Sequence, residues 1–382
     1  MSDPRKLRVL HVGKFYPPYM GGIETHLQNL CNELRDLVDL KVLVSNSSTQ
    51  TIEETVEGVS VTRVGTRATL SAAPISPGLV SRIRREAADI VHLHHPNPIA
   101  VMAYLMSGHR GKMVITYHSD IVRQKALGRV FQPFLDRSLA WADAIIATSP
   151  NYLATSAVLQ AHRDRCEVLP YGIPVEQFAN RDEAAIARLR ERYGSRVVIT
   201  VGRLIYYKGF DVLVRAMKDV NGTLLVVGDG PLRAELEAQA LSLGISDRVH
   251  FLGEIHNRDI AAYYHASDVF ALASVARSEA FGIVQLEAMA CGLPVVNTGL
   301  DSGVPFVSLD GLTGLTVPPG DSVALSRTLN KLLDDDELRG RLGDAARKRV
   351  DTEFTAPVMG RRMLDLYTSL VGRGESGRAT SR

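Results

Sequence analysis

Short apolar segments of strand length alternate with helical segments along this chain, and the alternation runs through it twice. Continuous apolar strands separated by helices are typical of parallel sheets, because helices cover both faces of such sheets. The sequence therefore predicts an α/β fold with two Rossmann-like, doubly wound domains. Predicted strands cover residues 7–12, 40–45, 90–93, 113–117 and 144–147 in the first run, and 197–201, 223–227, 249–252, 269–272 and 294–297 in the second.

The length of the chain agrees with two domains. At 382 residues it exceeds the size at which a single hydrophobic core usually stops growing. We place the first domain at residues 1–175 and the second at 195–352, with the hinge between Pro170 and Ser195. A helix is predicted over 23–37 in the first run, and helices in the second are predicted to begin near Gly209, Pro231, Arg258, Gly282 and Asp321.

Cysteine content and hydropathy indicate a cytoplasmic protein. Cys31, Cys166 and Cys291 are isolated along the chain and odd in number, which points to a reducing compartment rather than a disulfide framework. The first eight residues contain no apolar stretch of signal-peptide length, and no run of about 18 apolar residues occurs anywhere. These features predict a protein that is neither secreted through a signal peptide nor inserted in a membrane.

The charge pattern argues against a nucleic-acid partner. The net charge is only +2, with a small excess of Lys and Arg in residues 1–175, whereas a nucleic-acid-binding protein would carry a stronger basic stripe. Two local basic clusters fit peripheral contact with an anionic inner membrane face, and they fit equally a helix face exposed to water. They are Arg82, Arg84 and Arg85, and Arg123, Lys125 and Arg129, the second followed by apolar pairs at 130–131 and 134–135.

Two glutamates stand at the start of a predicted helix and inside it. Gly282 opens an apolar run at helical spacing, and Gly292 followed by Pro294 closes it, so Glu279 lies just before the helix and Glu287 about two turns deeper. Free amides in the first turn form an anion site between the two carboxylates. Such a place can hold a phosphate while the carboxylates accept hydrogen bonds from hydroxyl groups. A bare pair of this spacing is otherwise two solvated charges on a surface helix.

Three other segments give this pair its context. Val201 to Gly209 contains Arg203 and Lys208 directly after a predicted strand, and Val227 to Pro231 is a Gly-rich turn. With these motifs, the chain resembles the retaining glycosyltransferases of family 4, whose signature is a Glu, seven residues and a second Glu. The resemblance covers residues 7–370. The third segment, Leu169 to Pro174, departs from the family's Pro-Asn-Gly-Val-Asp at Tyr171 and Pro174, so the contacts of that Asn and Asp are not carried over.

The resemblance implies the GT-B fold, in which two Rossmann-like domains face a central cleft. It further implies that residues 1–175 bind the acceptor, that 195–352 bind a nucleotide-sugar donor, and that a last helix at 356–370 crosses back to the first domain. The implied reaction moves a hexose from a UDP- or GDP-linked donor to the hydroxyl of a glycan or lipid-linked acceptor, with retention, during assembly of cell-surface polysaccharide or glycolipid. No cofactor is expected besides this donor substrate.

Site residues in the second domain follow from the same motifs. Arg203 and Lys208 match the family's phosphate-binding pair, where two cations stabilise a leaving diphosphate. We expect Glu287 to bind the ribose hydroxyls and Glu279 the hydroxyls of the transferred sugar. Backbone groups near Phe281, Gly282 and Ile283 are expected to surround the sugar and phosphates.

The first domain contributes two candidates. Gly22, in the loop Met20 to Glu24, lets the backbone come close to a ligand at the start of a helix. His118 follows the predicted strand 113–117, and the family has a His at the equivalent strand end beside the reacting sugar. An imidazole there can accept a hydrogen bond from a sugar hydroxyl or share developing positive charge; the alternative is an ordinary loop histidine.

Two patterns suggest a metal at first sight. Alternation places His92 and His94 of the group His92, His94 and His95 on one face of a strand, and no matching Cys or acidic cluster accompanies them. We therefore predict a loop before Pro96 and Pro98 that shapes the acceptor pocket. Asp334 and Asp336 form an Asp-x-Asp pattern between two predicted C-terminal helices, where Asp is a common cap. We therefore predict no metal site.

Two rival functions remain open, and a third is disfavoured by the sequence. A nucleotide-sugar epimerase of the same build would also need phosphate-binding cations, and a pseudoenzyme would only bind the sugar nucleotide. A NAD-dependent oxidoreductase would need a third glycine in its Gly-x-Gly-x-x-Gly turn, but Gly228 and Gly230 are followed by Arg233 at that place.

Overall fold

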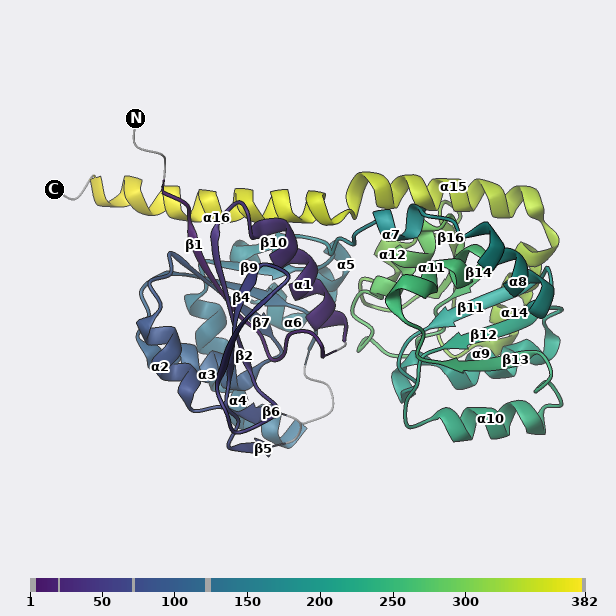
Figure 1. Cartoon of the computed structure of the whole chain (residues 1–382), viewed down its shortest axis with the longest axis horizontal. Helices are drawn as coiled ribbons and strands as arrows, with labels where there is room; N and C mark the ends of the chain where they lie inside the picture. The colour runs from purple at the N-terminus through teal and green to yellow at the C-terminus, as the bar shows by residue number, and fades with distance from the viewer. Residues whose placement is uncertain (1–4, 20, 71–72, 121–124, 380–382) are drawn as a thin grey trace. The chain divides into compact units, whose positions relative to one another are not determined.

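The computed structural model describes residues 5–19, 21–70, 73–120 and 125–379, which form two compact units (Figure 1). The first unit contains Met1–Gly172 together with Ala356–Arg382, and the second contains Ile173–Thr355. Each unit is built on its own sheet, so the prediction of two Rossmann-like α/β domains is confirmed. The chain passes between the units at 172 and 173 and again at 355 and 356, next to a bridge that pairs Ile173 with Thr355.

The sheet of the first unit has eight strands in the order β10-β9-β8-β7-β1-β2-β4-β3. All neighbours are parallel except β3, which runs antiparallel to β4. A separate hairpin consists of β5 (Ala68–Leu70) and β6 (Ala73–Ile75). The strands of the large sheet are β1 (Arg8–Val12), β2 (Asp39–Ser45), β3 (Ile52–Val56), β4 (Val59–Val64), β7 (Ile90–His95), β8 (Lys112–Tyr117), β9 (Ala144–Ala147) and β10 (Cys166–Val168).

Seven α-helices belong to the described part of the first unit. Two of them, α1 and α16, pack against each other although they come from opposite ends of the chain. Helix α1 buries Leu27, Leu30 and Leu34 at helical spacing in one core with Met363 and Tyr367 of α16. A Cβ on Gly360 would lie 2.6 Å from the Cβ of Glu33, so glycine permits this close approach. The helices are α1 (Gly22–Leu34), α2 (Gly78–Arg85), α3 (Pro98–Ser107), α4 (Lys125–Trp141), α5 (Pro150–Thr155), α6 (Ala157–Gln160) and α16 (Ala356–Ala379).

The sheet of the second unit has six parallel strands in the order β13-β12-β11-β14-β15-β16. This is the doubly wound order in which the chain reverses direction between β11 and β14, and ligands of such sheets bind beyond the carboxyl ends of the strands at that reversal. The strands are β11 (Val197–Val201), β12 (Thr223–Val227), β13 (Val249–Gly253), β14 (Val269–Ala271), β15 (Val295–Thr298) and β16 (Gly314–Val317).

The helices of the second unit cover both faces of this sheet (Figure 1). Its core is made of apolar strand residues such as Val198, Leu224 and Val269, packed against Leu213 and Leu329 from the helices. The helices are α7 (Glu176–Ala179), α8 (Glu183–Tyr193), α9 (Phe210–Ala216), α10 (Arg233–Ser242), α11 (Asn257–His265), α12 (Ile283–Ala290), α13 (Val304–Val307), α14 (Ser322–Asp334) and α15 (Asp336–Glu353).

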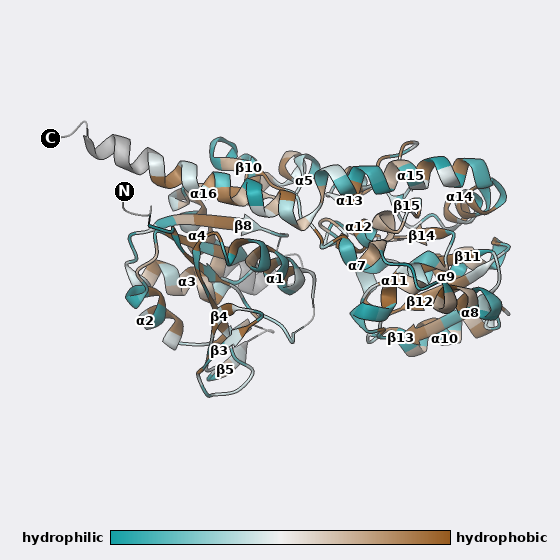
Figure 2. Cartoon of the chain, turned by 45° about the horizontal axis from the view of Figure 1, so that its top comes forward, coloured by the Kyte–Doolittle hydropathy of each residue, from teal (hydrophilic) through white to brown (hydrophobic). Residues whose placement is uncertain are grey.

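All ten predicted strands occur, but the prediction of a wholly parallel first sheet is wrong. The antiparallel pair β3 and β4 was missed because β3 is an edge strand with exposed residues from Ile52 to Thr55, whereas β8 is hydrophobic over its middle (Figure 2). Both residues of the turn, Glu57 and Gly58, have positive φ angles, which suits a two-residue hairpin. The predicted helix 23–37 ends earlier, at Leu34.

Candidate functional site

Helix α12 begins without a side-chain cap. Gly282 precedes its first residue with a φ of 75°, and no side chain of the described residues caps the first turn. A Cβ on Gly282 would lie 2.8 Å from Leu272 and 2.9 Å from Gln285, so both the φ angle and the packing require glycine. Gln285 N already donates to Gly282 O at 2.9 Å, so the first-turn amides that can bind an anion are those of Ile283 and Val284.

The loops that follow β11 and β14 meet beside this helix end. Lys208 ends the short 3-10 helix η2 (Tyr206–Lys208), and its Nζ lies 2.5 Å from Oε2 of Glu279. Ser274 Oγ donates a second hydrogen bond to the same oxygen, at 3.2 Å. Only 13% of the Lys208 side chain and 9% of the Glu279 side chain are exposed. The structure thus brings together two of the residues that the sequence singled out from separate motifs.

Lys208 remains protonated although its side chain is mostly buried. Burial lowers the pKa of the Lys208 ammonium, but the nearby Glu279, Tyr207 and Glu287 raise it, and the net pKa lies above its ordinary value. Lys208 is therefore a cation at neutral pH. An ammonium has three N–H donors, so it can keep its contact with Glu279 and still donate to a ligand oxygen.

Glycines hold the loop of Arg203 against the Gly-rich turn. A Cβ on Gly228 would lie 2.2 Å from the carbonyl oxygen of Gly202, and one on Gly230 would lie 2.5 Å from that of Leu204. Leu204 N donates to Asp229 O at 2.9 Å, which ties the two loops together. Arg203 is exposed on this loop.

Glu287 lies deeper on α12 and is half-buried. Tyr264 Oη donates a hydrogen bond of 2.8 Å to its Oε2, and none of the described residues donates to its Oε1. Burial raises the pKa of Glu287 to about 7, although Tyr264 and Lys208 act in the opposite direction. Its second oxygen can accept a hydrogen bond from a ligand hydroxyl.

A buried amide network behind α12 was not predicted from the sequence. Gln285 Nε2 donates to Phe281 O at 3.0 Å, and Asn297 Nδ2 donates to Gln285 Oε1 at 3.1 Å. These bonds fix the loop that carries Phe281. Asn297 ends a predicted strand at its carboxyl end, which is the one signal that could have identified it.

His118 occupies a buried position in the first unit. It follows β8 and is 2% exposed, and both of its ring nitrogens have protein partners. Nδ1 contacts Tyr171 Oη, and Nε2 lies 3.0 Å from His94 Nδ1. A sugar hydroxyl would have to replace one of these partners, so the proposed role of His118 stays a prediction. Gly22 is the first residue of α1.

The predicted strand 90–93 continues to His95 as β7, so His94 and His95 lie in the strand and not in a loop, and the side chains of His92, His94 and His95 are all buried. His11 on β1 and His26 on α1 join them, which the sequence did not indicate. The described residues that could hold a metal form two groups, His11 with His92 and His94, and His26 with His94 and His118. Within each group the candidate ligand atoms lie within 4.8 Å of one another.

Comparison with known proteins places the chain in a family. Residues 20–177 match the family described as Glycosyltransferase Family 4, and residues 182–349 match Glycosyl transferases group 1. The chain is 33% identical over 369 residues to O-antigen chain mannosyltransferase C of Escherichia coli, covering 96% of this chain and 99% of that protein. The chain belongs to glycosyltransferase family 4.

Two further comparisons describe this glycosyltransferase. It is 34% identical to D-rhamnosyltransferase WbpZ of Pseudomonas aeruginosa, over 92% of this chain and 93% of that protein. The solved structure of sucrose-phosphate synthase from Thermosynechococcus elongatus superposes with a TM-score of 0.81 at 24% identity, covering 96% of this chain and 100% of that one. That likeness confirms the GT-B fold.

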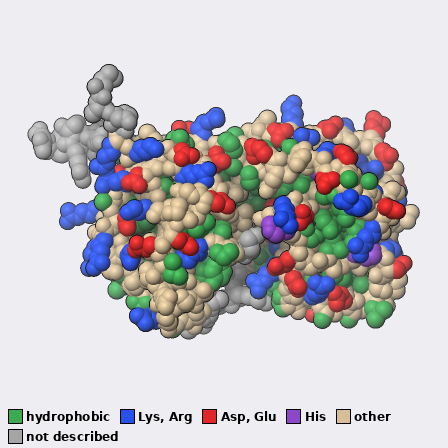
Figure 3. Space-filling model, viewed as in Figure 1, with side chains coloured by type: hydrophobic (Ala, Val, Ile, Leu, Met, Phe, Trp, Pro, Cys, Tyr) green, Lys and Arg blue, Asp and Glu red, His purple; other side chains and the backbone are tan. Residues whose placement is uncertain are grey.

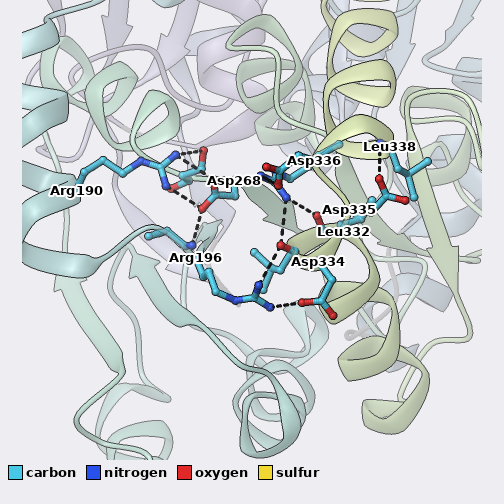
Figure 4. Close-up of polar contacts among 12 residues, drawn as sticks. Arg190, Arg196, Asp268, Leu332, Asp334, Asp335, Asp336 and Leu338 are labelled. Carbon is cyan, nitrogen blue, oxygen red and sulfur yellow. Dashed lines mark hydrogen bonds and ion pairs between the residues drawn. The ribbon is translucent and has the colours of Figure 1, made fainter.

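The residues of the Asp-x-Asp pattern form ion pairs at the junction of α14 and α15 in the second unit (Figure 4). Asp334 ends α14 and pairs with Arg196 at 2.7 Å, whereas Asp336 begins α15 and pairs with Arg339 at 2.6 Å. Asp335 between them caps α15 by accepting from Leu338 N. Neither Asp334 nor Asp336 belongs to the groups of described residues that could hold a metal.

The basic clusters of the glycosyltransferase are partly engaged within the protein. Arg82 pairs with Glu53, and Arg84 donates to the carbonyl oxygens of Met106 and Ser107. Arg123 lies outside the described residues, as do the side chains of Lys125 and Arg129. No helix in the described part of the chain is long and apolar enough to cross a membrane.

The predicted apolar pairs of α4 divide between the core and the surface. Phe131 and Leu135 are buried, whereas Phe134 is 41% exposed. Acidic and basic side chains are interspersed on the face of each unit shown in Figure 3. The side chains at the basic start of α4 lie outside the described residues, so membrane contact stays a prediction.

The substitution Glu287→Gln is expected to raise the Tm of the glycosyltransferase at pH 8 by about 2–4 °C, and to leave it nearly unchanged at pH 4.5. The folded pKa of Glu287, about 7, exceeds its usual 4.5, so the folded state holds this proton more tightly and stability falls as pH rises through that window. Gln has no charge to desolvate. Calorimetric melts at both pH values measure the difference, and an equal shift at both would contradict this origin.

Proposed function

We propose that this glycosyltransferase transfers a hexose from a nucleoside-diphosphate sugar to an acceptor hydroxyl, with retention at the anomeric carbon. The two relatives named above are a mannosyltransferase and a D-rhamnosyltransferase. D-rhamnose is the 6-deoxy form of mannose, so both sugars have the manno configuration. We therefore propose a manno-configured donor sugar, carried by GDP or UDP, and a glycan or lipid-linked acceptor in cell-surface polysaccharide or glycolipid assembly.

The observation that supports this proposal best is the Lys208–Glu279 pair beside the uncapped start of α12. The pair lies after β11 and β14, where the doubly wound sheet reverses. In the proposed complex, the first-turn amides and Lys208 hold the diphosphate, with Arg203 as a second cation. Glu279 accepts hydrogen bonds from the transferred sugar, and Glu287 Oε1 accepts one from the ribose.

The proposed chemistry depends on position and charge rather than on a covalent nucleophile. The leaving diphosphate gains negative charge as the glycosidic bond breaks, so Lys208 and the amides stabilise the transition state more than the bound donor. We propose that an oxygen of the departing phosphate takes the proton of the acceptor hydroxyl, which places the new bond on the same face as the old one. The chain then needs no general base next to the acceptor.

A donor screen tests the proposal. GDP-mannose, UDP-glucose and UDP-N-acetylglucosamine are each mixed with the protein, and both the Tm and the release of nucleoside diphosphate are followed. We expect GDP-mannose, the manno-configured donor of the three, to raise the Tm most and to be hydrolysed slowly without acceptor. Conversion of a donor to its epimer, at a rate that does not depend on an acceptor, would indicate an epimerase. Binding without hydrolysis or transfer would indicate a pseudoenzyme.

Sugar transfer is expected to persist after removal of divalent metal. Lys208, Arg203 and the first-turn amides of α12 together offset the charge of a diphosphate, so no metal is needed for that purpose. The rate is measured after thorough chelation and again with Mg²⁺ or Mn²⁺ added back. Rates within about twofold of each other are expected, and loss of activity that only a metal restores would refute this prediction.

A further inference from the structure

A continuous chain of hydrogen bonds crosses the interior of the first unit. Its members come from β1, β7, β8, the segments after β8 and β10, and α16, and each is at most 5% exposed. From one end to the other the links are Tyr171 Oη to His118 Nδ1, His118 Nε2 to His94 Nδ1 (3.0 Å), His94 Nε2 to His11 Nδ1 (3.0 Å), His11 Nε2 to Tyr367 Oη (3.3 Å), Tyr367 Oη to His92 Nδ1 (2.5 Å), and His92 Nε2 to Thr116 Oγ1 (2.7 Å).

The protons along this chain are arranged collectively. A neutral imidazole has one N–H donor and one nitrogen acceptor, and a hydroxyl can donate one bond and accept another. Burial lowers the pKa of all four histidines, so their rings are neutral at pH 7. The three directly linked rings, His118, His94 and His11, can satisfy their links only if all donate in the same direction, because one reversed ring would set two N–H groups, or two lone pairs, against each other. The Tyr367 hydroxyl has one proton, so it can donate to only one of its two histidine neighbours.

The two bonds of Tyr367 decide the direction. Hydroxyl donors prefer heavy-atom distances of about 2.7–2.8 Å, whereas N–H donors prefer about 2.9–3.0 Å. Tyr367 Oη lies 2.5 Å from His92 Nδ1 but 3.3 Å from His11 Nε2. Tyr367 therefore donates its proton to His92 and accepts from the Nε2–H of His11.

That assignment extends along the chain to His118. If His11 carries its proton on Nε2, its Nδ1 accepts from the Nε2–H of His94, and His94 Nδ1 accepts from the Nε2–H of His118. His118 Nδ1 is then a hydrogen-bond acceptor, and Tyr171 is its donor. A sugar hydroxyl can take the place of Tyr171 only while this nitrogen carries no proton.

We propose that Tyr367 is a positioning residue which, through His11 and His94, holds His118 in the Nε2–H tautomer. In that tautomer His118 Nδ1 accepts a hydrogen bond from a hydroxyl group. The tautomer follows from the hydrogen-bond chain alone, and its effect on transfer rests on the proposed function. Helix α16 thereby acts on the site residue His118, to which it contributes no direct hydrogen bond among the described residues.

The tautomers can be read directly by long-range ¹H–¹⁵N spectra of the full-length protein labelled with ¹⁵N in histidine. We expect Nε2–H signatures for His118, His94, His11 and His92. Tyr367→Phe removes the hydroxyl without changing shape, so His118 is expected to become a mixture with a detectable Nδ1–H form. Thr116→Val, which removes only the terminal acceptor, is expected to leave His118 as Nε2–H. Tyr104→Phe, which removes a buried hydroxyl of α3 outside the chain, is the control.

Three spectroscopic results would overturn the proposal. They are an Nδ1–H form of His118 in the unchanged protein, a metal-bound nitrogen in either histidine group, and a His118 tautomer that Tyr367→Phe leaves untouched. In steady-state assays Tyr367→Phe is expected to lower kcat about fivefold, with the donor KM within about twofold, whereas Tyr104→Phe changes neither. An unchanged kcat beside altered spectra would refute the effect on transfer. Failure of the proposed function would appear separately, as no turnover by the unchanged protein.

Discussion

The substitution Lys208→Ala is expected to lower the kcat of sugar transfer by about a hundredfold or more. Lys208 is nearly buried, remains charged, and stands at the start of α12 within 2.5 Å of Glu279. Its ammonium is therefore positioned where a leaving diphosphate would gain charge, and no reorganisation of solvent is needed to stabilise that charge. Steady-state rates with the full donor measure the loss.

A double variant separates this catalytic effect from a loss of stability. Removing Lys208 alone leaves the buried Glu279 without its cation, and breaking a buried ion pair costs roughly 3–5 kcal/mol. Lys208→Ala combined with Glu279→Gln removes both charges, so much of the stability should return, while kcat should fall well below that of Glu279→Gln alone. Activity of the single variant within about threefold of the unchanged protein would exclude Lys208 from the mechanism.

The substitution Glu279→Gln is expected to lower turnover of the intact donor by about tenfold to a hundredfold. Gln keeps the volume of the side chain but loses charge-assisted hydrogen bonds to the sugar hydroxyls, which individually contribute roughly 1.5–3 kcal/mol. The transferred sugar is absent from the product nucleotide, so affinity for the bare nucleoside diphosphate should hardly change.

An exposed glutamate of the same unit provides a matched control. Glu235 on α10 is exposed, and Glu235→Gln makes the same chemical change at a surface position. We expect it to leave turnover within about twofold. If Glu279→Gln behaved like this control, Glu279 would have only its structural role as the partner of Lys208 and Ser274.

Sequence reasoning succeeded where a local pattern determines the structure. The apolar strands β11 and β14 could be recognised from their residues alone, and parallel strands place the loops at their carboxyl ends along one edge. The proximity of Lys208 and Glu279 follows from that rule and from the order of the strands. The start of α12 at Gly282 was likewise visible, because glycine and an apolar helical run mark it.

Contacts between distant segments could not be predicted in the same way. His11 and Tyr367 are 356 positions apart, and nothing in either local sequence indicates the other. The raised pKa of Glu287 depends on its burial in the folded unit, and its partner Tyr264 comes from α11, 23 positions away in the sequence. The edge strand β3 was missed because Glu53, Glu54 and Thr55 interrupt it, so it lacks the continuous apolar run of the buried strands.

Titration calorimetry with GDP and UDP tests most directly the claim that α12 holds a nucleoside diphosphate, with Glu287 at the ribose and Glu279 at the sugar. For the nucleotide that the unchanged protein binds better, Glu287→Gln is predicted to weaken binding by about tenfold or more, because a charge-assisted hydrogen bond is lost. Glu279→Gln and Glu235→Gln should remain within about twofold. Equal weakening by both site variants, or weakening by Glu279→Gln alone, would contradict the assignment, and no change in either variant would leave the two glutamates without a role in nucleotide binding.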